Sequence, residues 1–204
     1  GVDGTWGRLQ GHGAKLDMAT STVATDLAVI CNTGSRNTFH NIKFRGLGTH
    51  ANSLYSVIEA GEYGYYSCCH IYKETVLATS MRAELLLNGD SPTFVNCMIG
   101  DSTNALTGTT QYNVVATAGV APTSYGSGVT RDGIFRDCIF WRLAGSTSNG
   151  FFYTANATDL ERILTFKNCQ FHAAKLGAVP AYALTNGAAY TRGGVLLDRC
   201  VATN

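Results

Sequence analysis

Seven cysteines are the residues of this 204-residue chain whose chemistry most needs an explanation. Thiolates bind metal ions or form disulfides, and both uses require sulfur atoms that converge at short range. Five of the cysteines instead occupy equivalent places in a repeated motif: Cys69, Cys97, Cys138, Cys169 and Cys200. Equivalent places in stacked repeats form a row with poor disulfide geometry. We therefore expect small buried hydrophobic side chains, with no metal and no cofactor.

Carboxylates are the second group, because glycoside hydrolysis uses two of them held about 5–10 Å apart. The acids considered are dispersed, without a pair motif or a cluster of three: Glu59, Glu62, Glu74, Glu84, Asp90, Asp101 and Asp132. We expect solvated acids and turn residues here, and we predict no catalytic residue. The Gln-Gly-His-Gly segment at 10–13 resembles a catalytic loop only superficially, and it is predicted to be a turn.

A motif of aromatic-x-Asn-Cys-x-apolar positions these residues and recurs about every 30 residues. One longer step, between Cys97 and Cys138, contains the Gly-, Ser- and Thr-rich range 100–131. We interpret that range as a loop insertion in a single domain spanning residues 1–204. A second strand signal precedes most motifs, as short apolar runs at 27–30, 55–58, 84–87, 162–165 and 194–197.

The spacing inside the motif predicts a corner. On one straight strand, positions three apart face opposite sides, so the aromatic and the cysteine both face inward only if the chain bends between them. Asn tolerates the left-handed backbone that such a bend requires. The expected ladder consists of an aromatic row, an Asn or Asp row and the cysteine row. The aromatic row consists of Phe39, Phe94, Phe135 and Phe166. The Asn or Asp row consists of Asn41, Asn96, Asp137 and Asn168.

Cys68 and Arg199 interrupt the Asn row. Short strands at this spacing, with weak helix signals, predict an all-β solenoid. We expect a right-handed parallel β-helix of about six coils, with successive coils ~4.8 Å apart.

The Phe-x-Asn-Cys-x-Phe pattern resembles the pectate-lyase-like β-helix superfamily. Longer stretches resemble bacteriophage virion proteins with this fold, at 37–44, 84–89, 94–101 and 164–171. The resemblance implies a virion location. It covers roughly residues 25–202 and indicates fold more specifically than function, since β-helices serve both enzymes and structural proteins.

The composition of the chain indicates which classes of binding partner to expect. Charged residues make up 14% of the chain, the net charge is +1 and no basic stripe is present, so we expect no nucleic acid. No run of ~20 apolar residues suggests a membrane span. The low charge favours self-association, and we predict a homotrimer. Tyr63, Tyr65 and Tyr72 are candidates for an oligomer contact or for contact with host glycan.

The predicted function is therefore a non-enzymatic structural component of a phage virion. A head decoration or accessory capsid protein, which would contact the major capsid protein, is favoured because the helix is short. The alternative is a tail spike or fibre fragment that binds or cleaves host surface polysaccharide.

Overall fold

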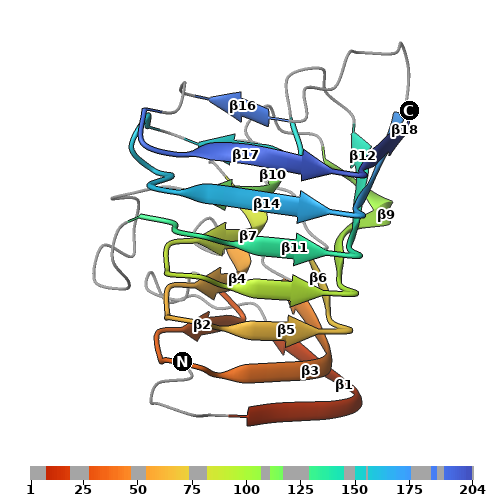
Figure 1. Ribbon diagram of the computed structural model, residues 1–204. Helices are drawn as coiled ribbons and strands as arrows, with labels where there is room; N and C mark the ends of the chain where they lie inside the picture. The colour runs from red at the N-terminus through yellow and green to blue at the C-terminus, as the bar shows by residue number, and fades with distance from the viewer. Residues whose placement is uncertain are drawn as a thin grey trace.

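The computed structural model describes residues 8–18, 28–46, 54–73, 82–106, 111–116, 129–144, 150–154, 156–175, 185–187 and 191–203. Every regular element in these ranges is a β-strand, and every strand pair is parallel (Figure 1). The prediction of an all-β parallel β-helix is confirmed.

A 12-stranded sheet forms two walls of the solenoid. We call its first half the front wall, which contains β17 (Gly194–Asp198), β14 (Ile163–Lys167), β11 (Ile134–Arg136), β8 (Thr93–Val95), β5 (Tyr65–Ser67) and the first half of β3 (Thr38–Gly46). The side wall contains the second half of β3, β6 (His70–Lys73), β9 (Met98–Leu106), β12 (Ile139–Ala144), β15 (Gln170–Lys175) and β18 (Val201–Thr203). Strand β1 (Arg8–Met18) pairs with both halves of β3.

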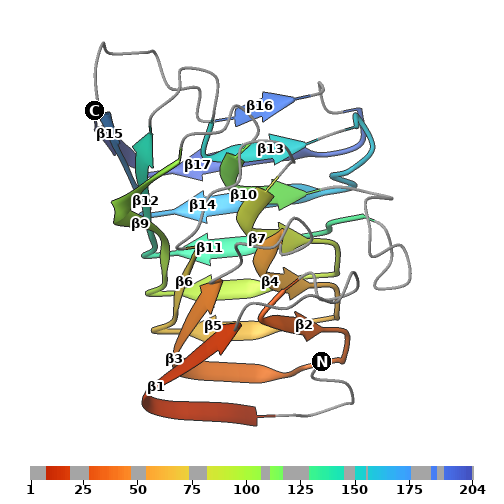
Figure 2. The same cartoon turned by 180° about the vertical axis from the view of Figure 1, so that it is seen from behind.

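A 6-stranded sheet closes the solenoid at the back. This back sheet contains β16 (Thr185–Gly187), β13 (Phe152–Thr154), β10 (Gln111–Ala116), β7 (Arg82–Leu87), β4 (Tyr55–Glu59) and β2 (Ile30–Asn32). In Figure 1 the chain runs left to right along the front wall, passes backward along the side wall, returns along the back sheet and rises one level, and Figure 2 shows the same path from behind. This screw is right-handed, as the sequence predicts. The number of coils differs slightly from the predicted six, whereas the fold class is as predicted.

A left-handed corner joins the front wall to the side wall in each coil. The residue before the cysteine position has a positive φ of 51–56° in six coils, at Asn41, Cys68, Asn96, Asp137, Asn168 and Arg199. The corner therefore persists where the Asn row is interrupted, because the strands on either side impose the backbone. A second left-handed corner, which the sequence analysis does not predict, begins the front wall at Arg36, Tyr63, Ser91 and Asp132.

Aromatic rings fill the interior behind the front wall. Phe39, Tyr66, Phe94, Phe135 and Phe166 stack with centroid separations of 4.6, 4.7, 4.7 and 4.9 Å along the row. All five are buried at 0–2% exposure. Their equivalent in the last coil, Leu197, is 44% exposed. This continuous stack forms the centre of the core and keeps the coils in register.

Three local predictions need correction. The runs at 162–165 and 194–197 belong to β14 and β17 of the front wall, because the strand continues directly into the motif's aromatic position. Within the range 100–131, which was expected to contain a loop insertion, residues 100–106 belong to β9 and residues 111–116 belong to β10. Residues 117–128, where most of the extra length lies, fall outside the described ranges.

The segment at 10–13 is the third correction. It was expected to form a turn, but it lies within β1, where the pairing with β3 shifts register between Gln10 and Ala14. Two glycines at this point allow the strand to accommodate a β-bulge, because Gly adopts backbone conformations that other residues avoid.

Candidate functional site

The outward face of the front wall carries an uncharged column. Side chains alternate along each strand, so the residue just before each stacked aromatic faces solvent. Strand register aligns these residues from coil to coil as Thr38, Tyr65, Thr93, Ile134, Thr165 and Leu196. We call this set the central column. None of its residues is charged, in contrast with the columns on either side.

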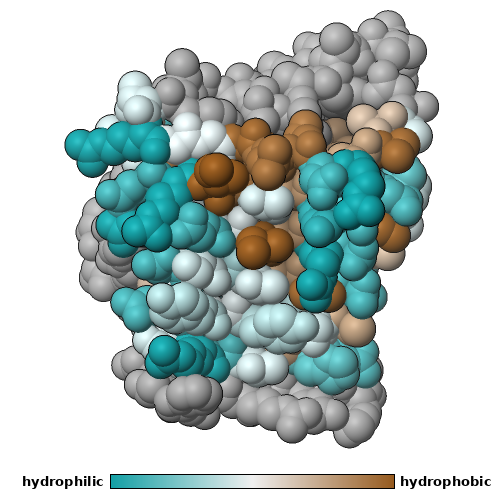
Figure 3. Space-filling model, in the orientation of Figure 1, coloured by the Kyte–Doolittle hydropathy of each residue, from teal (hydrophilic) through white to brown (hydrophobic). Residues whose placement is uncertain are grey.

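The upper half of the central column contains two exposed apolar residues. Ile134 and Leu196 are 40% and 51% exposed, and Ile163, which lies beside the column on β14, is 52% exposed. Figure 3 shows hydrophobic groups in the upper middle of this face, with hydrophilic groups to either side. Scattered exposed apolar residues are ordinary, but adjacent ones with a polar border are typical of interaction surfaces.

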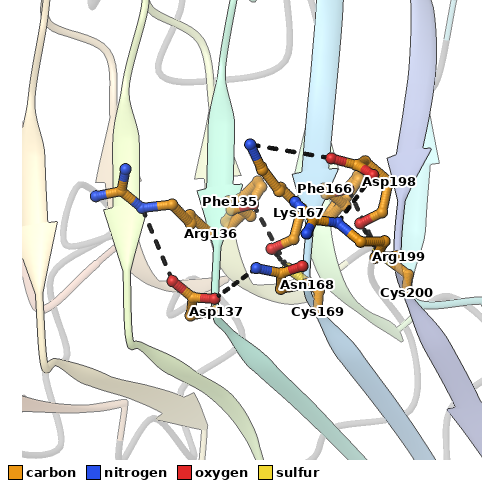
Figure 4. Close-up of polar contacts among 10 residues, drawn as sticks. All are labelled: Phe135, Arg136, Asp137, Phe166, Lys167, Asn168, Cys169, Asp198, Arg199 and Cys200. Carbon is orange, nitrogen blue, oxygen red and sulfur yellow. Dashed lines mark hydrogen bonds and ion pairs between the residues drawn. The ribbon is translucent and has the colours of Figure 1, made fainter.

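The right rim, as seen in Figure 1, follows the corner at the end of the front wall. It consists of Arg136, Asp137, Lys167, Asp198 and Arg199. Ion pairs join neighbours at 3.8 Å (Arg136–Asp137), 4.0 Å (Lys167–Asp198) and 3.3 Å (Arg199–Asp198). Asn168 Nδ2 donates a 3.1 Å hydrogen bond to Asp137 Oδ1 of the coil below (Figure 4). These pairs are exposed, so each contributes little to stability, and they determine mainly the charge pattern of the rim.

The left rim lies where the chain enters the front wall. Its described charges are Arg36, Glu62, Asp90, Arg131, Asp132, Glu161, Arg162 and Arg192. Arg162 pairs with Asp132 at 2.7 Å, and Arg131 pairs with both Asp90 and Glu161. Isolated bridges connect Glu62 with Asp90 and Asp90 with Arg131, so this rim is also a stacked ladder.

The three candidate tyrosines lie in different environments. Tyr63 is 50% exposed on the left rim, where the Arg36 guanidinium lies 5.4 Å from its ring centroid. Tyr65 is 37% exposed in the central column. Tyr72 is 5% exposed in the side wall, stacked on His70 at 4.4 Å with Lys43 Nζ over its ring. Tyr63 and Tyr65 thus present a common outward surface, whereas Tyr72 does not belong to it.

The cysteine row lies inside the corner and makes a regular set of contacts. The single S–H of each thiol is within hydrogen-bond distance of two carbonyls, that of the residue two positions earlier and that of the aromatic in the coil below. For Cys138 these are Arg136 O (3.4 Å) and Phe94 O (3.5 Å). The thiol of the next coil, followed by burial, raises the pKa of Cys69. For Cys138 the thiol of Cys169 is the largest cause, and the pKa rises to about 12 although the hydrogen bond with Cys97 acts in the opposite direction. All seven cysteines are free.

These thiols are therefore hydrogen-bond donors that hold the corner, and a thiol is a poor ligand or nucleophile until it is deprotonated. Cys68 faces outward and is exposed, while the adjacent Cys69 is buried, as the alternation along the chain predicts.

Two acids that were expected to be solvated are buried instead. Burial raises the pKa of Glu59 and of Glu84 to about 7 in each case. Glu59 accepts hydrogen bonds from Asn32 Nδ2 (2.8 Å), Gly61 N (3.2 Å) and Tyr66 OH (2.5 Å). A Cβ at Gly64 would lie 2.6 Å from Glu59 Oε2, so only glycine leaves room for this carboxyl.

Glu84 lies in β7, 3% exposed, with buried Lys73 and Arg142 acting on it electrostatically. Arg142 donates to the carbonyls of Gly150 and Gln111. The sequence could have predicted the burial of both acids, because each lies in or next to an apolar strand run and strands of parallel sheets are buried on both faces.

The remaining candidate acids do not converge. Glu62, Asp90 and Asp132 belong to the left rim, whereas Asp101 lies in the side wall, where its Oδ1 accepts from Thr103 N and Oγ1, both at 2.8 Å. Glu74 lies outside the described residues. In the described ranges, no three His, Cys, Asp or Glu residues are grouped so as to hold a metal ion. No helix in that part of the chain has the length and apolar character to cross a membrane.

The face with the clearest potential for binding is thus the front wall, with its central column between two charged rims. Comparison of the chain with protein-family models, with curated proteins and with solved structures finds no match in any of the three.

Proposed function

We propose that this protein is a non-enzymatic structural subunit of a bacteriophage virion, and specifically a head decoration or accessory capsid protein. The observation that carries the proposal is the front wall, an exposed uncharged column between two charged rims on a stiff stack of coils. Such a surface suits assembly into a particle. The sequence resemblance to phage β-helix proteins supports the virion as that particle.

The chemistry of the motif residues agrees with a structural role. The residues at the aromatic, corner and cysteine positions have structural roles in each coil, since the rings stack, the corner residues turn the chain and the thiols bond to carbonyls. Binding to partners would therefore use the side chains that face outward. The proposed partners are further copies of this chain and the major capsid protein.

The test is to locate the protein in particles. Purified virions of a phage that encodes this chain are separated into heads and tails, and each fraction is analysed by quantitative mass spectrometry. The proposal expects the protein in heads, at a fixed ratio to the major capsid protein. Its absence from both fractions would contradict a virion role, and its presence only in tails would replace the head assignment.

A second candidate, a tail spike or fibre fragment that binds or cleaves host polysaccharide, is favoured by one feature of the side wall. Trp141 stacks on His172 of the next coil at 4.6 Å, and His172 is within hydrogen-bond distance of Gln170 (3.0 Å) and Thr203 (2.8 Å). Aromatic faces bordered by polar groups suit sugar rings.

Calorimetric titration with host surface oligosaccharides tests this candidate. Binding that Trp141→Ala abolishes and Tyr63→Ala retains would support it. Release of oligosaccharides from the polymer would overturn the non-enzymatic assignment.

A further inference from the structure

We infer that the cysteine row is a binding site for soft monovalent cations, such as Cu(I) or Ag(I), which bridge consecutive thiolates in a straight line. The row has one thiol in each of five successive coils, at Cys69, Cys97, Cys138, Cys169 and Cys200. Such binding goes beyond the proposed structural role and does not depend on it. No metal was expected here, because zinc requires four ligands that converge on one point. A two-coordinate cation requires only two sulfur atoms, one on either side.

Each thiol of the row occupies the same place in its coil. The distance from Sγ to the carbonyl oxygen two residues earlier is 3.4 Å for the first four thiols and 3.6 Å for Cys200. The distance from Sγ to the carbonyl oxygen of the aromatic in the coil below is 3.3–3.6 Å in all five. Consecutive sulfur atoms are therefore separated by about one coil repeat, ~4.8 Å. The stacked rings beside them repeat at 4.6–4.9 Å.

This repeat matches the span of a linear sulfur–metal–sulfur unit. The bond between a thiolate and the d10 ion of a zinc site is about 2.3 Å long, so two such bonds in line span about 4.6 Å. Cu(I) and Ag(I) are also d10 ions, and soft thiolate ligands select Cu(I). In the described ranges, no three His, Cys, Asp or Glu residues are grouped to hold a metal ion of higher coordination number. The row therefore favours a two-coordinate cation over zinc.

Backbone carbonyls line each step of the row. Phe94 belongs to the same coil as Cys97, and its carbonyl oxygen lies 3.5 Å from Sγ of Cys138 in the coil above. The other three steps have equivalent carbonyls, those of Tyr66, Phe135 and Phe166. A cation between two sulfur atoms would thus have the negative end of a carbonyl dipole beside it. Burial of a positive charge is less unfavourable where thiolates and such dipoles face it.

The proton and charge balance favours a continuous chain of cations over separate pairs. The five thiols lose five protons to solvent, and four cations then form eight metal–sulfur bonds, two to each inner thiolate and one to each end thiolate. The filled row carries one net negative charge, whereas two separate pairs would carry two, and buried charge is unfavourable. Deprotonation is favoured at Cys169, because its hydrogen bond with Cys138 lowers the pKa of its thiol. We therefore expect four cations per folded chain.

The experiment titrates the folded chain with Ag(I) in a chloride-free buffer. A Cys31→Ser and Cys68→Ser background removes the two cysteines that lie outside the row. Elemental analysis after desalting gives the silver retained per chain, and X-ray absorption spectroscopy identifies the neighbours of each silver ion. We expect four silver ions per chain, each with two sulfur neighbours, and no retention of Zn(II). A chain that stays folded by circular dichroism and retains no silver, or silver with a single sulfur neighbour, would overturn the inference.

Two single substitutions in that background distinguish a continuous row from independent thiols. Cys138→Ala removes the middle thiol and breaks two steps, so the silver retained per chain should fall from four to two. Cys200→Ala is the matched control, because it removes an end thiol and breaks one step, so three silver ions should remain. Equal losses in the two variants would show that the thiols bind independently and would contradict bridging.

A third substitution covers the case in which Cys138→Ala does not fold. Cys138→Ser keeps a hydrogen-bond donor for the carbonyls of Arg136 and Phe94 but replaces the soft sulfur with a hard oxygen. The row should again retain two silver ions. Retention of four by Cys138→Ser would contradict the row, since the oxygen is a poor ligand for a soft cation.

Discussion

Tyr66 donates a 2.5 Å hydrogen bond to the carboxyl of Glu59 inside the solenoid. The tyrosine belongs to the aromatic row of the front wall, and the glutamate comes from β4 of the back sheet, so this bond spans the interior between two walls. The hydrogen-bond donors to Glu59 among the described residues, Asn32, Gly61 and Tyr66, are all neutral. Its protonation state is therefore linked to folding.

Stability should fall as the pH rises from about 5 to 8. Burial raises the pKa of Glu59 from 4.5 to about 7, so the folded state binds a proton more tightly than the unfolded state. Its stabilising effect is fully present below pH 4.5 and is lost as the pH rises through about 7. A shift of that size corresponds to roughly 3 kcal/mol of unfolding free energy. Urea unfolding at several pH values measures it.

Glu59→Gln should reduce this pH dependence, because glutamine keeps an acceptor for Tyr66 without titrating. Glu84 titrates in the same direction, so the double variant with Glu84→Gln should have the flattest profile. Exposed Glu62→Gln, three positions from Glu59, is the control and should retain the wild-type slope. A wild-type stability that is constant from pH 5 to 8 would contradict the assignment.

Removal of one ring from the aromatic row should strongly lower the free energy of unfolding. Phe135 is fully buried between Phe94 and Phe166, at 4.7 and 4.9 Å. We expect Phe135→Ala to lower the unfolding free energy by about 3–5 kcal/mol, through lost burial and the cavity left behind. Ile134→Ala removes an exposed side chain on the same strand and should cost less than about 1 kcal/mol. Equal effects of the two substitutions in urea unfolding would show that the row does not support the core.

Thiol reactivity should separate the two cysteines of the Cys68-Cys69 pair. Cys68 is exposed at the corner, whereas Cys69, Cys97 and Cys138 are buried with raised pKa values. We expect a maleimide to modify Cys68 rapidly in the folded protein and the three row thiols only on unfolding, as peptide mass spectrometry would report. Cys68→Ser should remove the fast phase. Rapid labelling of Cys97 in the native state would contradict the closed corner.

The corner backbone should tolerate glycine better than branched residues. Cys68 has a φ of 54°, a conformation that costs most L-residues about 1–2 kcal/mol. Cys68→Gly should therefore be neutral or stabilise by up to about 1 kcal/mol, whereas Cys68→Val should destabilise. The same pair of substitutions at Ser67, one residue earlier in β5, should reverse the order, since a strand favours valine. Thermal unfolding of the four variants provides the comparison.

The front-wall half of each coil was predictable because its signals are local. An aromatic, a corner residue and a cysteine lie within four positions, and alternation alone determines which of them face inward. The back sheet was less predictable. Strand β10 contains Gln111 and Asn113, whose polarity obscures a fully buried strand. The Nδ2 group of Asn113 donates to the carbonyls of Ile99 and Trp141, which lie in other strands.

The buried acids and the front-wall face depend on long-range register, which sequence spacing does not reveal. Glu59 is stabilised by Asn32, one coil earlier, and by Tyr66, on another wall. The central column becomes visible only when Ile134 and Leu196 are placed on the same face through two strand pairings. Pairwise contacts across coils, rather than residue types, therefore determine both features.

The recurring left-handed corner makes the coil a unit of length. Asp137, Asn168 and Arg199 turn the front wall into the side wall in successive coils with φ of 56°, 53° and 53°, although their side chains differ in size and charge. This corner thus depends on backbone shape and hardly on side-chain identity. Duplication of one whole coil in the gene would preserve every corner and lengthen the molecule by a single ~4.8 Å step. The corner therefore allows the length of such a protein to change in evolution through the number of its coils, while the packing inside each coil is kept.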